Sequence, residues 1–381
     1  MKEKNTTRPP LESLACVNPD CDLYGQKGRN NLIIRKTYGR DNIRYLRCRS
    51  CQQEFSERKN TALWNSKIPE AKAVSVAEHL ADGCSLKSTA RLVKVDASTV
   101  RRLNQKTGRH GQQYHEQEVQ DVAVTELQAD ERHGFAGSKA QPAWEAELMD
   151  PQSKFILAHV QGARDETLIR RLLEDGAARL HNRHGVALFT DGLAAYRTLF
   201  PEIFGYAYYP PRQGARGPHP QARFRIPRTA AHVQIIKHQS GYHLEAVEIR
   251  YAHGSKKRID QALARLGYNV PNTSAIERRN GTARLMSAAQ VRKTLAFAGK
   301  ESTKEAMGWW GMTVYNWCRE HRSLKRPLPE PVGKKSMNKG RRLWLSVWPI
   351  QSYQFGRFFS LRFTHRAVGD NLTGLPFLFR L

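Results

Sequence analysis

Acidic residues and long apolar runs are both scarce in this chain of 381 residues. It has 35 Asp and Glu against 62 Lys and Arg, a formal net charge of +27 and a pI near 10.1. A protein this basic attracts polyanions, most commonly nucleic acid, with ribosome association or non-specific adhesion as alternatives. No run approaches the roughly 18 consecutive apolar residues of a membrane-spanning helix, so no membrane partner is expected.

Cysteines are also few, and four of the six have paired spacing, as Cys16-x4-Cys21 and Cys48-x2-Cys51. The polar N-terminus, Met1-Lys-Glu-Lys-Asn, shows no signal peptide, so we expect a cytoplasmic protein with reduced thiols. Four thiolates on two knuckles, with β-like runs between them, suit a closed structural Zn²⁺ site. Residues 1–60 are therefore predicted to be a zinc ribbon; the alternative is four free cysteines in an ordinary domain.

A helical pattern follows over residues 61–115, and the part from Ser85 to Lys106 fits a helix-turn-helix. Ser98 is the expected N-cap of its second helix, and both helices are expected to be short. Six apolar residues would form the shared seam: Leu86, Ala90, Val93, Val95, Val100 and Leu103. Five polar residues would face phosphates and base edges in a DNA major groove: Thr99, Arg101, Arg102, Gln105 and Lys106. The alternative is a three-helix packing unit with a solvated basic face.

Three acidic residues stand in settings that suit metal ligands. Asp130 follows an apolar-alternating run, and Asp191 closes Val186-Ala-Leu-Phe-Thr-Asp191, so both are expected at strand ends. Glu277 lies at the start of a helix predicted over residues 274–322. Carboxylates from separate elements suit two Mg²⁺ (or Mn²⁺) ions. Taken singly, each residue could instead be an exposed strand end, a plain turn or half of a solvated ion pair. The three in order after a DNA-binding pattern indicate a metal site more strongly than any one of them.

Two further side chains share the helix face of Glu277. Asn280 lies about one turn away and Arg284 nearly two turns away. Such donors could contact a scissile phosphate or steady a carboxylate from a second shell.

Residues 116–324 alternate strand-like and helical runs, which predicts an α/β catalytic domain. Within it, residues 205–235 are rich in Pro, Gly, Arg and aromatic residues, which predicts a loop or an insertion. Residues 325–381 are expected to be a basic linker and a tail to which no fold is assigned.

The order and wording of five motifs across residues 16–322 resemble the transposases of the bacterial insertion sequence one family. The motifs are Arg44-Tyr-Leu-Arg-Cys-Arg-Ser-Cys51, Ser88-Thr-Ala-Arg-Leu92, Asp130-Glu-Arg-His-Gly-Phe-Ala-Gly-Ser-Lys139, Thr190-Asp-Gly-Leu-Ala-Ala-Tyr196 and Ile276-Glu-Arg-Arg-Asn-Gly-Thr-Ala-Arg284. The resemblance implies a ribonuclease-H-like catalytic fold, an Asp-Asp-Glu triad at Asp130, Asp191 and Glu277, and binding of the element's ends by the N-terminal modules. It also implies a prokaryotic, nucleoid-associated protein.

The chain departs from the family in three places. Asp191 and Glu277 are 86 residues apart, which is longer than in compact members, so residues 205–270 are expected to be an insertion. Leu193 stands where Trp is common, and the segment from about residue 340 matches nothing in the family.

The resulting expectation is a DNA transposase that uses two metal ions for strand cleavage and strand transfer. Its partners would be double-stranded DNA, both transposon ends and target, and further copies of itself in a homodimer or larger assembly. One alternative is a DNA-binding regulator or domesticated transposase that lacks catalysis. Another is a different two-metal nuclease with the same fold, such as a resolvase or an RNA-cutting enzyme.

Overall fold

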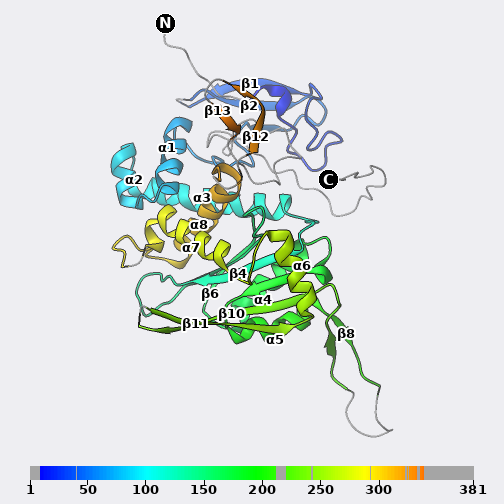
Figure 1. The fold of residues 1–381 in the computed structure, drawn as a ribbon. Coiled ribbons are helices and arrows are strands. Elements are labelled where there is room, and N and C mark those ends of the chain that lie inside the picture. Colours follow the sequence, from blue (N-terminus) through cyan, green and yellow to red (C-terminus); the bar gives the residue numbers. More distant parts are fainter. Residues whose placement is uncertain are drawn as a thin grey trace. The chain divides into compact units, whose positions relative to one another are not determined.

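The computed structural model describes residues 9–39, 41–211, 220–241, 243–291, 293–321 and 324, and the backbone alone of 326–332 and 335–338. The chain forms two compact units (Figure 1), one with the described residues up to Ala71 and one with those from Lys72 onward. The tail over residues 339–381, to which the sequence assigns no fold, lies outside the described residues.

The first unit is built on a small antiparallel sheet in the order β1-β2-β3. Its elements are η1 (Leu11–Ser13), β1 (Leu32–Tyr38), β2 (Ile43–Cys48) and β3 (Glu54–Ser56). The β-like runs predicted between the two cysteine pairs are β1 and β2. A core this small, built mainly from Leu14, Leu32, Leu46, Phe55 and the cysteines themselves, gives limited stability of its own.

Three helices open the second unit: α1 (Glu70–Ala81), α2 (Leu86–Val93) and α3 (Ala97–Glu118). The Ser85 hydroxyl caps α2 by accepting from the Ser88 N–H. The prediction that Ser98 caps the next helix is wrong, because Asp96 takes that place and its carboxylate accepts from the Ser98 N–H at 2.7 Å. A carboxylate at an N-cap also favourably meets the positive end of the helix dipole.

Helix α3 is longer than the short second helix expected from the sequence, and its second half packs on α8 (Glu301–Thr313). Glycine makes this approach possible: a Cβ at Gly108 would lie 2.4 Å from the carbonyl oxygen of Ala306. The Asn104 side chain donates to the carbonyl of Thr303 at 3.3 Å. Within the second unit, one continuous helix therefore runs from the turn after α2 to the contact with α8.

The large sheet has six strands in the order β11-β10-β7-β4-β5-β6. The strands are β4 (Glu126–Arg132), β5 (Trp144–Met149), β6 (Ile156–Gly162), β7 (Ala187–Thr190), β10 (Ala231–Ser240) and β11 (His243–His253). Strands β4, β5 and β6 are an antiparallel meander, β7 runs parallel to both β4 and β10, and β11 returns antiparallel. The predicted α/β class is confirmed at this level.

Helices cover both faces of this sheet. Helices α4 (Glu166–Arg179) and α5 (Ala194–Phe204) share the main core with Leu188 of β7. Helix α6 (Lys256–Leu266) packs on the neighbouring residues Ala187 and Phe189, which point to the opposite face because side chains alternate along a strand. Among the described residues, no helix combines the length and apolarity needed to cross a bilayer.

The single helix predicted over residues 274–322 is wrong. Helix α7 (Ser274–Met286) ends where the backbone of Ser287 turns extended, and η3 (Ala288–Gln290), a loop, α8 and a π-turn, η4 (Val314–Cys318), follow. The amide of Gln290 donates to buried Glu145 at 2.5 Å, so a contact with β5 holds the chain where the helix stops.

The segment over residues 205–270 contributes to the sheet as well as forming a separate hairpin. Strands β10 and β11 and helix α6 belong to the sheet and its cover, whereas β8 (Tyr206–Tyr208) and β9 (Arg223–Arg225) pair only with each other. The 3-10 turn η2 (Arg183–Gly185) precedes β7. Strands β12 (Arg326–Val332) and β13 (Lys335–Asn338) pair antiparallel where the sequence suggests a linker.

Candidate metal centres

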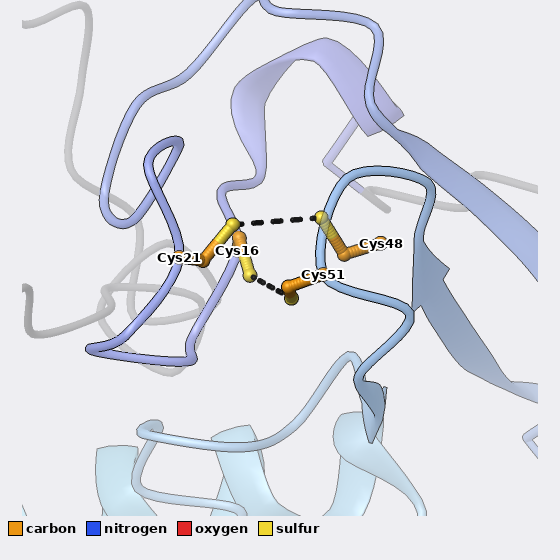
Figure 2. A group of neighbouring side chains, drawn as sticks. All are labelled: Cys16, Cys21, Cys48 and Cys51. Atoms are coloured by element: carbon orange, nitrogen blue, oxygen red, sulfur yellow. Dashed lines mark hydrogen bonds between the residues drawn. The ribbon is translucent and has the colours of Figure 1, made fainter.

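The four paired cysteines converge in the first unit (Figure 2). The Sγ atoms of Cys16 and Cys51 are 3.6 Å apart, and those of Cys21 and Cys48 are 3.9 Å apart. In a tetrahedral site with Zn–S bonds of about 2.3 Å, neighbouring sulfur atoms lie about 3.8 Å apart, whereas a disulfide needs about 2.05 Å. The four sulfur atoms, all within 4.8 Å of one another, are placed to bind a zinc ion.

The surroundings of this cysteine cluster act differently on its members. Burial raises the pKa of Cys16 and of Cys21, whereas the pKa of Cys51 is lowered. Burial acts to raise the pKa of Cys51, but hydrogen bonds from the Gln53 backbone and the Asn18 side chain lower that pKa to about 7. The Asn31 amide donates to the Cys48 sulfur at 3.2 Å, a contact that steadies a metal ligand from outside. Four sulfur ligands leave no open coordination position, so a zinc ion here would be structural.

A second candidate centre lies where β4 and β7 end. These strands are parallel neighbours with Gln128 opposite Phe189, and extending that register by two residues sets Asp130 beside Asp191. Oxygen atoms of Asp130, Glu131 and Asp191 lie within 4.8 Å of one another, so this acidic cluster could hold a divalent cation. Asp191 directly follows its strand, whereas Asp130 lies inside β4, two residues before its end.

Asp130 is held in an environment that resists its ionisation. Burial, and then the charges of Glu131 and Asp191, raise the pKa of Asp130 to about 7. Its two carboxylate oxygens accept from the Glu131 N–H and from the Asn280 amide, each at 2.8 Å. A bound cation would relieve this repulsion, so the electrostatics and the ligand geometry agree.

Glu277 is brought to the edge of the acidic cluster and is not one of its members. It lies in the first turn of α7, and its carboxylate accepts from the Lys237 ammonium and the Thr273 hydroxyl, both at 2.6 Å. Its charge helps to raise the pKa of Asp130, which places it within electrostatic reach. Both ends of the Lys237–Glu277 pair are about 40% exposed (39% and 42%), so breaking it costs about 1 kcal/mol or less.

Three residues of the site were not singled out from the sequence: the cluster member Glu131, and Tyr196 and Arg164 beside it. Glu131 is almost fully buried, accepts from the Tyr196 hydroxyl and pairs with Arg164 at 3.3 Å. Arg164 also lies 3.9 Å from Asp191, with its guanidinium 4.7 Å from the Trp144 ring centre. The Asp130-Glu131 tandem and Tyr196 of the second acidic motif were available as signals, but nothing in the sequence around Arg164 points to this site.

Helix α7 contacts the acidic cluster through Asn280. The buried Asn280 amide donates to Asp130, and its oxygen accepts from Arg132 at 3.2 Å. Arg284 lies, half-buried, in the last turn of the same helix.

The predicted DNA-facing residues occupy the first turns of α3. Arg101 and Arg102 are exposed, and Thr99, Gln105 and Lys106 are partly buried. Burial lowers the pKa of Lys106. Of the predicted seam, Ala90, Val100 and Leu103 are buried, while Leu86, Val93 and Val95 are partly covered.

Replacing Cys48 by Ser should remove a zinc ion from the chain, because three sulfur atoms no longer close the site. We expect stoichiometric zinc in the wild-type protein by atomic absorption, little in Cys48→Ser, and earlier proteolysis within residues 9–71 of that variant. Cys84→Ser, outside the cluster, should keep both zinc and protection. A cysteine cluster that stays protected after chelation would contradict a zinc-dependent first unit.

The acidic cluster should make metal-free protein sensitive to pH. The folded pKa of Asp130, about 7, lies above its ordinary 3.8, so its contribution to stability is full below pH 3.8 and lost as pH rises through 7. Asp130→Asn should therefore stabilise metal-free protein at pH 8 by roughly 2 kcal/mol more than at pH 5. Thermal unfolding measures this, with Asp260→Asn, an exposed carboxylate on α6, as control. Added Mg²⁺ should stabilise the wild type and not the Asp130 variant.

Neither a protein-family model nor a curated protein matches this chain in sequence comparison. The geometry of the two centres is therefore the main support for a functional assignment.

Proposed function

We propose that this protein is a DNA transposase of an insertion sequence that binds the element's terminal inverted repeats and catalyses metal-dependent strand cleavage and strand transfer. One observation carries the proposal: the carboxylates of Asp130, inside β4, and Asp191, directly after the parallel neighbour β7, meet at one point. Helix α7, which bears Glu277, is joined to the same place through the Asn280–Asp130 hydrogen bond.

The order of the strands supports a ribonuclease-H-like reading of the large sheet. Three antiparallel strands, β6, β5 and β4, are followed by two that run parallel to β4, namely β7 and β10. Asp130 lies on the central strand of these five and Asp191 follows its parallel neighbour. Strand β11 is an addition at the edge.

The donor set fits hard divalent cations, because the oxygen atoms of Asp130, Glu131 and Asp191 converge and Glu277 lies next to them. Two Mg²⁺ (or Mn²⁺) ions about 3.5–4 Å apart would activate a water or a 3′ hydroxyl and stabilise the leaving oxygen of an in-line displacement at phosphorus. The protein's own contribution would be positioning and charge neutralisation.

Side chains around the cluster have distinct parts in this proposal. Glu277 would join the other ligands by turning away from Lys237, and the released ammonium would then be free for a phosphate of the DNA. Arg164, beside both Glu131 and Asp191, is a second cation for that backbone. Asn280 would hold Asp130 in one orientation while the ligand set changes.

The N-terminal modules would supply DNA recognition. Helices α2 and α3 support a helix-turn-helix reading, with Lys94 in a left-handed conformation at the turn and Arg101 and Arg102 exposed on the second helix. The second half of α3 packs on α8, so DNA bound to the first turns of α3 would be held by a helix that is anchored in the second unit. Joining requires two element ends, so the proposal includes a dimer or larger assembly.

A DNA-binding regulator or domesticated transposase without catalysis is the second candidate. The observation that favours it is the pairing of Glu277 with Lys237, which leaves one of the three expected ligands engaged elsewhere.

Asp191→Asn should separate the two candidates. Removing one ligand charge should reduce strand transfer at least about a hundredfold, because catalysis depends on exact placement of the reacting groups, while affinity for the element's ends stays within about twofold. The measurement is joining of linear DNA with the element's ends, beside a binding titration. Asp260→Asn is the matched control. A wild type that binds and never joins DNA would favour the regulator.

Arg101→Ala with Arg102→Ala tests the recognition helix. If both side chains contact phosphates, affinity for the ends should fall, and the slope of log affinity against log salt should decrease by about two, one for each lost contact. Lys256→Ala with Lys257→Ala removes the same charge from an exposed part of α6 and should leave the slope nearly unchanged. Equal slopes for the two double variants would remove the recognition-helix assignment.

A further inference from the structure

The hairpin formed by β8 and β9 is anchored at one end only. Its first residue, Tyr206, stacks on the His184 ring with centroids 3.9 Å apart, and His184 Nδ1 lies 3.0 Å from the carbonyl oxygen of Phe204. Ile226, just after β9, packs against the main core. Beyond this base the ribbon runs out past the sheet (Figure 1). These contacts anchor the base of the hairpin in the second unit.

The ribbon has no core of its own. Every residue of both strands is exposed, and Tyr209, which follows β8, is 74% exposed. A two-stranded hairpin in water is marginally stable at best, so aromatic side chains without burial are not explained by folding. Exposed aromatic residues that gather on one element indicate a contact surface.

Strand register sorts the ribbon into two unlike faces. Tyr206 is opposite Arg225 and Tyr208 is opposite Arg223, so two tyrosines and two arginines share one face. The Arg225 guanidinium lies 5.4 Å from the ring centre of Tyr208. The other face presents the Ala207–Phe224 pair. The hairpin therefore has a Tyr–Arg face.

The charge of this segment has one sign. From Ile203 to Leu244 the sequence contains no Asp or Glu, while it contains five Arg and one Lys. Among the described residues, no carboxylate forms an ion pair with Arg223 or Arg225. Unpaired guanidinium groups beside aromatic rings suit a polyanion with flat or apolar sugar and base surfaces. They disfavour a second copy of this basic chain.

We propose that the Tyr–Arg face of the β8–β9 ribbon is a second DNA-binding surface, which contacts the backbone of duplex DNA outside the helix-turn-helix footprint. A two-stranded ribbon is narrow enough to lie in a major groove. Arg223 and Arg225 bind phosphates, and the tyrosine hydroxyl groups and rings contact phosphates and sugars. The partner rests on the proposed function; the surface is independent of α2, α3 and the acidic cluster.

Duplex DNA with the element's end and its flanking sequence tests this surface, by fluorescence anisotropy across a salt series without added divalent cation. Arg223→Ala with Arg225→Ala should weaken binding about tenfold near 0.15 M salt and reduce the salt slope by about two. Lys256→Ala with Lys257→Ala is the charge-matched control. Tyr208→Ser should weaken binding, whereas Phe224→Ser, on the opposite face, should not. Circular dichroism should show the same fold for every variant.

Each other outcome overturns a defined statement. If the arginine variant and its lysine control bind equally well, the ribbon is not a DNA surface, although end binding and catalysis stand. If Phe224→Ser matches Tyr208→Ser, the assignment of the Tyr–Arg face is wrong. A loss seen only with single-stranded DNA overturns the duplex assignment. A wild type that binds no DNA overturns both this surface and the proposed function.

Discussion

A buried ionic network inside the second unit is the constraint on which its candidate site depends. Glu147 of β5 is fully buried between Arg132 of β4, at 2.8 Å, and Arg279 of α7, at 2.9 Å. Burial opposes the charge of Glu147, yet the two guanidinium groups hold its pKa well below the ordinary value. Lys304 of α8 pairs with the neighbouring Glu145 in the same interior. Such a network adds little net stability. Losing one partner leaves a buried charge unpaired, however, which costs about 3–5 kcal/mol.

The same network determines where α7 lies against the sheet. Arg279 fixes the helix to β5, and the next residue, Asn280, then bridges Arg132 and Asp130. Glu277, one turn earlier, arrives at the edge of the acidic cluster as a consequence. Polar partners of this kind specify one arrangement where apolar packing would tolerate several. The positions of Asn280 and Glu277 against the acidic cluster therefore depend on ion pairs that lie outside that cluster.

The sequence predicted what is local and missed what is not. Three features could each be predicted from a few neighbouring residues. They are the paired cysteines, the position of Asp191 directly after its strand, and the position of Glu277 in the first turn of α7. The contacts of Glu131 with Tyr196 and Arg164 join separate elements, and no spacing rule reveals them. The end of α7 was not predicted, because the chain there is held by a hydrogen bond from Gln290 to Glu145, 145 residues away in the sequence. Helix α3 was expected to be short, and its continuation to Glu118 goes with the close contact of Gly108 with α8, which no local pattern reveals.

Charge ties these features together. A chain with a net charge of +27 concentrates three buried or half-buried carboxylates at one point, where burial and then their mutual repulsion raise the pKa of Asp130. Arg164 and Lys237 border this point, and each already holds one of the site's carboxylates. A divalent cation would take over those carboxylates and free both side chains for phosphate. Under the proposed function, metal binding would in this way make the site attract the DNA backbone, so metal and DNA should bind there cooperatively.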